Sequence, residues 1–138
     1  IEAPEEREMM GKEARGRITF EFSTETTDKM DWLIISVRDD GQGIDHERLR
    51  NKIVEARPEV DLTKLSQHEL IQAVFDPGLT TKQEVGEFSG RGVGLNAVKD
   101  AAMALGGSAE VFSELGKGTR VVVRVPLKFV QKSLTQAA

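Results

Sequence analysis

The chain has 138 residues, with 19 lysines and arginines against 23 aspartates and glutamates, so its formal net charge at pH 7 is −4. This length suits one domain with a real hydrophobic core, and the absence of cysteine excludes disulfide scaffolds, thiolate zinc sites and cysteine nucleophiles. The longest unbroken apolar run, 101–105, is far shorter than the ~20 residues that a membrane helix needs. Because the balance is mildly acidic and aromatic residues are few, we expect no nucleic-acid partner and no membrane contact.

The first part of the chain predicts a short helix and a β-hairpin. Residues 4–10 read as a helical turn with Pro4 in its first turn. From Arg17 apolar and polar residues alternate, which is typical of a half-buried strand, and a second strand is expected over 32–37 after a turn over 26–31. The second strand leads directly into the sequence Asp-Asp-Gly-Gln-Gly.

Two helices and a long loop are expected next. Asp45 can cap a helix that runs to about Ala56, and Ser66 begins a capping box for a helix that includes Val74. The stretch 75–92 carries one proline and four glycines without any periodicity. Because structureless loops longer than ~12–15 residues are uncommon unless they are functional or disordered, this stretch predicts a mobile lid.

The last part predicts a helix from about Val93, ended by two glycines, and then strands over 109–113 and 120–127. We expect one domain over 1–127 and a frayed tail over 128–138. Antiparallel strand pairs with helices gathered on one face predict an α+β two-layer sandwich, not a doubly wound fold.

The first candidate binding site follows the second strand. The carboxylate of Asp39 at the strand end can accept a hydrogen bond from an exocyclic amine such as that of adenine. Gly41 and Gly43 would let the backbone approach a flat ring closely. An ordinary Asp-Gly turn is the alternative explanation of the same residues.

The second candidate is the glycine-rich segment before the last helix, where backbone N–H groups and the helix dipole can hold phosphate. Arg91 adds a cation there, and a flexible helix entry is the alternative. The spacing does not fit the dinucleotide fingerprint, and no Walker-type phosphate loop occurs in the sequence. The residues of this segment are Gly90, Arg91, Gly92, Gly94 and Leu95.

Two weaker features also point to an anion. Arg48 and Lys52 stand four residues apart on a predicted helix and can face one ligand, although solvated basic residues are the commoner case. Thr80 and Lys82 lie in the predicted lid and could meet phosphate, or could be ordinary loop residues.

Taken together, the ordered segments DDGQGI, FDPGLTTK, SGRGVGLNAV and GKGT closely resemble the ATP-binding catalytic domain of sensor histidine kinases, in its chemotaxis (CheA-type) variant. The similarity runs from Ile1 to about Leu127. It implies the Bergerat-type fold shared with gyrase, heat-shock chaperone and mismatch-repair ATPases. That fold is a two-layer α/β sandwich with a mixed sheet, helices on one face and a flexible ATP lid.

The resemblance also implies roles for individual residues. Asp39 would accept the adenine amine, with Gly41 and Gly43 shaping its pocket, while Arg48 and Lys52 reach toward the phosphates. The other residues that it implies for the nucleotide site are Phe75 as lid anchor, Thr80 and Lys82 on the lid, Gly90, Arg91, Gly92, Gly94 and Leu95 in the phosphate-side loop, and Thr119 beside Asp39.

One family feature has no counterpart in the sequence. In the family, a helix with an Asn that holds Mg²⁺ lies just upstream of the segment matching 1–7, next to a His or Glu that helps the transfer. We therefore expect neither a catalytic residue nor a metal ligand in this chain, since His46 and His68 have no partners at metal spacing. We expect a chain that is inactive alone and exposes apolar surface, with self-association or low stability as the result.

The function that the resemblance implies is transfer of the ATP γ-phosphoryl, with Mg²⁺, to a histidine on a partner phosphotransfer or dimerisation domain. The phosphoryl would then pass to a response regulator in a cytoplasmic bacterial chemotaxis phosphorelay, and a homodimer is compatible with this. Two alternatives stay open. One is an ATPase of the gyrase or mismatch-repair type, and the other is a non-catalytic, degenerate kinase fold that binds a partner.

Overall fold

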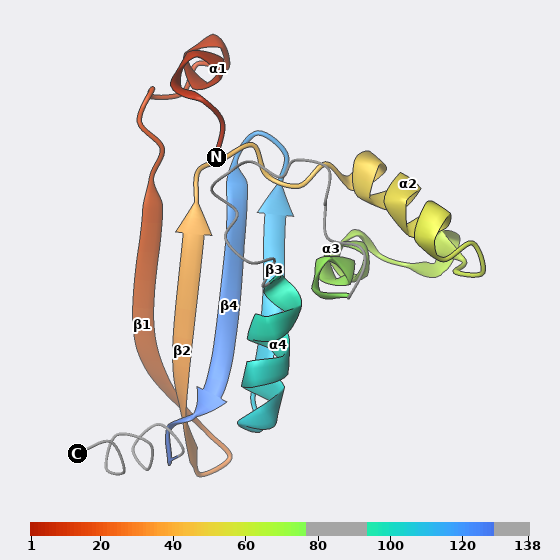
Figure 1. The fold of residues 1–138 in the computed structure, drawn as a ribbon. Helices are drawn as coiled ribbons and strands as arrows, with labels where there is room; N and C mark the ends of the chain where they lie inside the picture. The colour runs from red at the N-terminus through yellow and green to blue at the C-terminus, as the bar shows by residue number, and fades with distance from the viewer. Residues whose placement is uncertain (77–93, 129–138) are drawn as a thin grey trace.

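A computed structural model describes residues 1–76 and 94–128 of the chain. The expected helices and strands are all found, in the expected order, as Figure 1 shows. The elements are α1 (Pro4–Met9), β1 (Ile18–Thr27), β2 (Met30–Asp39), α2 (His46–Ala56), the 3₁₀ turn η1 (Leu62–Lys64), α3 (Gln67–Gln72), the 3₁₀ turn η2 (Ala73–Phe75), α4 (Leu95–Ala104), β3 (Ser108–Glu114) and β4 (Gly118–Pro126). In the described ranges no helix has the length and apolarity to cross a bilayer. The predicted lid from residue 77 on and the tail from residue 129 on lie outside the described residues.

The hairpin of β1 and β2 is longer than the sequence predicts, because its turn is tighter. Only Asp28 and Lys29 form the turn, with φ of 53° and 63°, and Thr27 already pairs with Met30. Two successive residues with positive φ match the right-handed twist of the flanking strands. The sequence predicts a turn over 26–31, but the outer residues of that range instead extend β1 and β2.

The four strands form one sheet in the order β1-β2-β4-β3. Every neighbouring pair is antiparallel, so the mixed sheet expected from the resemblance is wrong for the described strands. The reason is visible in Figure 1: β2 and β3 run in the same direction, but β4 lies between them and runs in the opposite direction. β4 thus separates β2 from β3, the strands that the helical segment connects and that run in the same direction.

Both predicted helix caps are confirmed. The Asp45 carboxylate accepts hydrogen bonds from the backbone N–H groups of Glu47 and Arg48 at 2.9 and 3.1 Å. At the start of α3, the Ser66 hydroxyl accepts from the Glu69 N–H, and the Glu69 carboxylate accepts from the Ser66 N–H. These bonds satisfy N–H groups that have no partner within the first turn of a helix.

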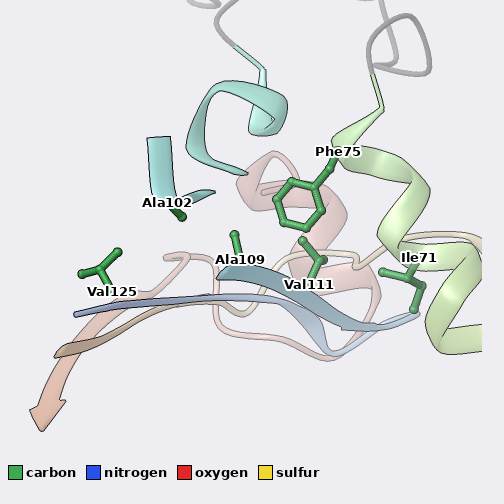
Figure 2. Close-up of a cluster of buried hydrophobic side chains, with 6 residues drawn as sticks. All are labelled: Ile71, Phe75, Ala102, Ala109, Val111 and Val125. Atoms are coloured by element: carbon green, nitrogen blue, oxygen red, sulfur yellow. The ribbon is translucent and has the colours of Figure 1, made fainter. Parts of the chain in front are cut away.

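The main hydrophobic core lies between the helices and the β3–β4 half of the sheet. Figure 2 shows Phe75 and Ile71, from α3 and the turn after it, beside Val111 on the sheet, with Ala102 of α4 nearby. Val111 is completely buried. A second cluster joins α2, η1 and α3, and its buried members are Leu49, Ile53, Leu62 and Leu70.

The helices cover only half of this sheet face. One row of paired residues crosses all four strands on it: Phe20, Val37, Val121 and Val111. Val111 is 0% exposed under the helices, whereas Phe20 on β1 is 62% exposed. No helix stands in front of β1 and β2 in Figure 1. The expectation that apolar surface is exposed is therefore confirmed on β1.

Candidate functional site

Asp39 is the last residue of β2, and its carboxylate is the acceptor group of the candidate site. Its Oδ1 accepts a hydrogen bond from the backbone N–H of Gly41 at 2.8 Å, which fixes the side chain at the strand end. Among the described residues, no donor to Oδ2 is recorded. This second oxygen can therefore accept a hydrogen bond from a ligand, for instance from an exocyclic amine.

The neighbouring Asp40 is engaged by the N-terminal part of the chain instead. Its Oδ1 accepts from the backbone N–H of Arg17 at 2.8 Å, and its Oδ2 pairs with the Arg7 guanidinium at 2.9 Å. The Arg17 N–H first, and Arg7 next, hold the pKa of the Asp40 carboxyl below its usual value. Of the two aspartates, Asp39 is thus the one with an oxygen available for a ligand.

The loop after Asp39 packs against the turn that joins β3 and β4. The Gln42 carbonyl accepts from the Gly116 N–H at 2.7 Å, and the Ile44 N–H donates to the Ser113 hydroxyl at 2.8 Å. These bonds bring together two motifs, DDGQGI and GKGT, that lie far apart in the sequence. The pocket edge is therefore built from two separate loops that hold each other.

Two glycines make this close packing possible. Gly43 has φ of +73°, and a Cβ there would overlap the carbonyl group of Glu114 and crowd that of Gly118. Gly118 has φ of +110°, and a Cβ there would overlap the carbonyl of Asp39. Only a residue without a side chain fits either position, because both the backbone angle and the space exclude one.

Thr119, at the start of β4, follows the glycine that touches Asp39. Its Oγ1 lies 3.0 Å from the Ser113 hydroxyl, which also hydrogen-bonds the Gly118 carbonyl. The structure thus places Thr119 beside the Asp39 end of β2, as the resemblance implies for it. The two hydroxyls form a polar edge between β3 and β4 at this end of the sheet.

The two basic candidates lie on α2, which the Asp45 cap connects to the loop. Arg48 is exposed and Lys52 is half-buried. Neither side chain has a recorded hydrogen bond or ion pair within the described parts of the chain. Both cations are therefore unengaged there, but the structure does not bring either of them into contact with Asp39.

The second glycine-rich segment is only partly described. Gly94 is the N-cap of α4, and the half-buried Leu95 packs against the main core. Phe75, expected to anchor the lid, is 2% exposed in the same core. The candidates that lie outside the described residues are Thr80, Lys82, Gly90, Arg91 and Gly92.

A cavity of about 340 Å³ opens at the same end of the sheet. Asp39 is not among its lining residues, and Arg38 and Arg120, which pair across β2 and β4, are. The candidate site therefore rests on Asp39 and its loop rather than on this cavity. The lining residues are Arg38, Phe112, Ser113, Glu114, Lys117, Gly118, Thr119 and Arg120.

Sequence reasoning missed three residues that shape the site. Ser113 interrupts the apolar alternation of Ala109 and Val111 on β3, and this polar residue at an inward position was the signal for it. Arg7 and Lys12 carried no comparable signal, because a basic residue on a short N-terminal helix is usually solvated. Their partners are in a loop far along the chain.

The arrangement can bind a flat ring that carries an exocyclic amine. It offers a fixed carboxylate oxygen, a loop with glycine at positions 41 and 43, and a pair of hydroxyls on the neighbouring strands. Within 1–76 and 94–128 there is no group of three or more His, Cys, Asp or Glu side chains that could hold a metal ion.

Comparison with known proteins agrees with this geometry. Residues 5–129 match the family described as histidine kinase-, DNA gyrase B- and HSP90-like ATPase. The chain is 41% identical over 128 residues to the gliding motility regulatory protein of Myxococcus xanthus, a match that covers 91% of this chain and 16% of the relative. It is 42% identical over 127 residues to the chemotaxis protein CheA of Treponema pallidum, a match that covers 92% of this chain and 15% of that relative.

A third relative is less similar in sequence. The chemotaxis protein CheA of Bacillus subtilis is 33% identical over 129 residues, which cover 92% of this chain and 19% of the relative. The chain thus spans less than a fifth of the length of these relatives. It belongs to the histidine kinase-, DNA gyrase B- and HSP90-like ATPase family, in the branch of the chemotaxis-type ATP-binding domains.

Proposed function

We propose that this chain is the ATP-binding catalytic domain of a chemotaxis-type sensor histidine kinase. In the longer protein it would hold ATP while a histidine on a phosphotransfer or dimerisation domain attacks the γ-phosphorus. The bond to the bridging oxygen breaks, ADP leaves, and the phosphoryl group passes on to a response regulator. The names of the relatives and the family match support this proposal, and a cytoplasmic location rests on the same resemblance.

The observation that carries the proposal is the Asp39 carboxylate. It stands at a strand end with one oxygen held by Gly41 and the other available, beside a loop in which Gly43 permits the close approach of a second turn. Adenine presents an amine donor where guanine presents a carbonyl acceptor. An acceptor held opposite position 6 of the base therefore favours adenine over guanine.

Mg²⁺ would accompany the nucleotide and neutralise phosphate charge during transfer. The described residues contain no set of ligands that fits it, so we assign no step to the metal. The work of the described residues is to bind the base, to orient it and to keep the loop in place. Arg48 and Lys52 on α2, and the candidates outside the described residues, would reach the phosphates.

Calorimetric titration of ADP, with and without Mg²⁺, tests the proposal on the chain and on Asp39→Asn. We expect binding that Asp39→Asn weakens by at least about tenfold, because the amide presents a donor to the adenine amine when it keeps its bond to Gly41. Glu21→Gln, on the exposed β1, is the matched control and should bind as the wild type does. Absence of binding under both conditions would leave the non-catalytic, partner-binding module as the better explanation.

A further inference from the structure

Arg7 is a charged residue that the fold buries, with 1% of it exposed in the described structure. Its guanidinium donates to the Asp40 carboxylate at 2.9 Å and to the Asp40 carbonyl at 3.1 Å. It also donates to the Glu2 carboxylate at 3.3 Å and to the Glu13 carbonyl at 2.8 Å. A buried cation is stable only when it is paired and hydrogen-bonded in this way. Arg7 therefore fastens α1 to the loop that follows β2.

Lys12 completes the same cluster. Its ammonium donates to the Glu2 carboxylate at 2.8 Å, to the Asp40 carbonyl at 3.0 Å and to the Gly41 carbonyl at 2.7 Å. These three bonds use all three of its protons. Two of the acceptors are the carbonyls of the residues that directly follow Asp39. The Lys12 ammonium thus holds the loop after Asp39 through backbone carbonyls.

The carboxylates of the cluster are held in their charged form. Lys12 first, and Arg7 to a lesser degree, lower the pKa of Glu2, whose side chain is 2% exposed. Neither cation nor Glu2 belongs to the two hydrophobic clusters. In some proteins a buried ion network fixes one arrangement without adding net stability. The cluster is therefore placed to orient the loop rather than to hold the core.

Gly41 links the cluster to the ligand-facing carboxylate. Its carbonyl is held by Lys12, and its N–H donates to Asp39 Oδ1 at 2.8 Å. A Cβ on Gly41 would lie 2.8 Å from the same oxygen, so a side chain at position 41 would push the Asp39 carboxylate away. We infer that Arg7 and Lys12 are positioning residues of the nucleotide site, which set the place of the Asp39 carboxylate through the backbone of Asp40 and Gly41. This inference rests on the proposed function.

The preference for adenine over guanine is the readout that separates positioning from stability. A loop that moves shifts the acceptor away from the adenine amine, so ADP binding weakens, whereas GDP bound in the same orientation turns its C6 carbonyl to that acceptor and gains nothing from it. A change that only destabilises the fold lowers the folded fraction for both nucleotides alike. The ratio of the ADP and GDP affinities therefore reports the position of Asp39.

The experiment titrates ADP and GDP into four proteins: the wild type, Lys12→Met, Lys12→Arg and Leu62→Ala. We expect Lys12→Met to bind ADP about tenfold more weakly, as for a lost charged hydrogen bond, and to lose much of its preference over GDP. Lys12→Arg retains donors for both carbonyls and should restore most of the preference. Leu62→Ala lies in the α2–α3 cluster and should lower stability with the ratio unchanged.

The outcomes separate the two proposals. If the wild type does not bind ADP, or if Asp39→Asn binds it equally well, the proposed function fails. If binding needs Asp39 but Lys12→Met keeps the wild-type ratio, the positioning role is wrong and the proposed function stands. Should Lys12→Met not fold, Glu2→Gln removes the carboxylate charge that pairs with both Lys12 and Arg7. An unchanged ratio in that variant would likewise overturn the inference.

Discussion

Glycines 43 and 116 adopt the same kind of backbone conformation for different reasons. Their φ angles are +73° and +82°, a region that favours glycine at both positions. A Cβ on Gly116 would meet nothing within 4 Å, whereas a Cβ on Gly43 would overlap the backbone of the β3–β4 turn. Gly116 therefore serves only its own turn, whereas Gly43 also lets two loops pack together.

We predict that Gly43→Ala costs far more stability than Gly116→Ala. The positive φ alone costs about 1–3 kcal/mol in either variant, and only Gly43→Ala must also move the turn that carries Thr119. Urea denaturation of both variants measures the two losses in the free energy of unfolding. Equal losses would show that the two loops can separate freely, which contradicts the packing described for the site.

The site residues that could be predicted from the sequence are those whose role is local. Asp39, Gly41 and Gly43 stand together in one short motif, so their types and spacing could be recognised without the fold. Arg7 and Lys12 could not be, because their partners lie 28 to 33 positions away and meet them only after the sheet has formed. A residue whose role depends on a distant backbone carbonyl leaves no pattern in the sequence.

The short helix α3 protects the edge of the sheet with a side chain. The Gln72 amide donates to the Val111 carbonyl at 2.8 Å, and its oxygen accepts from the Val111 N–H at 3.1 Å. One side chain thus makes the pair of bonds that a neighbouring strand would make to β3, at the edge strand of the sheet. An edge that is engaged in this way is less open to pairing with another chain.

The capping box at the start of α3 predicts a dependence of stability on pH. Glu69 has a pKa below its usual value of 4.5, chiefly because of the Ser66 hydroxyl and then the Ser66 N–H. A lowered folded-state pKa means that the stabilisation is present above pH ~4.5 and is lost as the pH falls through the lower, folded value. Glu69→Gln keeps an acceptor for the cap, so we expect a small loss at pH 7 and a shallower decline below pH ~4.5.

Denaturation series between pH 7 and pH 3 measure this decline. Glu59→Gln is the control, because the Glu59 carboxylate makes no recorded hydrogen bond in the described structure. It should follow the wild-type decline. A Glu69→Gln protein that declines as steeply as the wild type would show that the cap does not contribute to the acid sensitivity.

The helices and strands were predicted where their signals are local, as at Asp45 and Ser66, whose caps need only the next three residues. The position of β4 was not predicted. Its alternating apolar residues would suit any inner place in a sheet, and nothing in the sequence near residues 118–126 shows that β2 lies on one side and β3 on the other. Strand order depends on the global packing.

The molecule as a whole has an unevenly covered sheet. The helices lie over β3 and β4, while three apolar side chains of β1 are exposed on the same face. They are Ile18, Phe20 and Phe22, at 58%, 62% and 67% exposure. Apolar surface that is contiguous on an edge strand favours contact with another apolar surface.

We predict that the isolated chain self-associates through this face as its concentration rises. Phe20→Thr together with Phe22→Thr should shift the sedimentation profile to the monomer, because threonine keeps the strand propensity and removes the aromatic surface. Met9→Thr, on the 82% exposed Met9 of α1, is the control and should associate as the wild type does. A wild-type chain that stays monomeric at every concentration tested would contradict the prediction.

The insertion of β4 between β2 and β3 has a consequence for how the domain is made. Until the last strand emerges during synthesis, β3 has no strand partner and the β1–β2 hairpin has no connection to it. The helices would meanwhile have only an isolated strand to pack on. Because the pairing of β2 with β4 closes a loop of some 80 residues, we expect slow, cooperative folding that begins only after the ribosome has released residues 118–126.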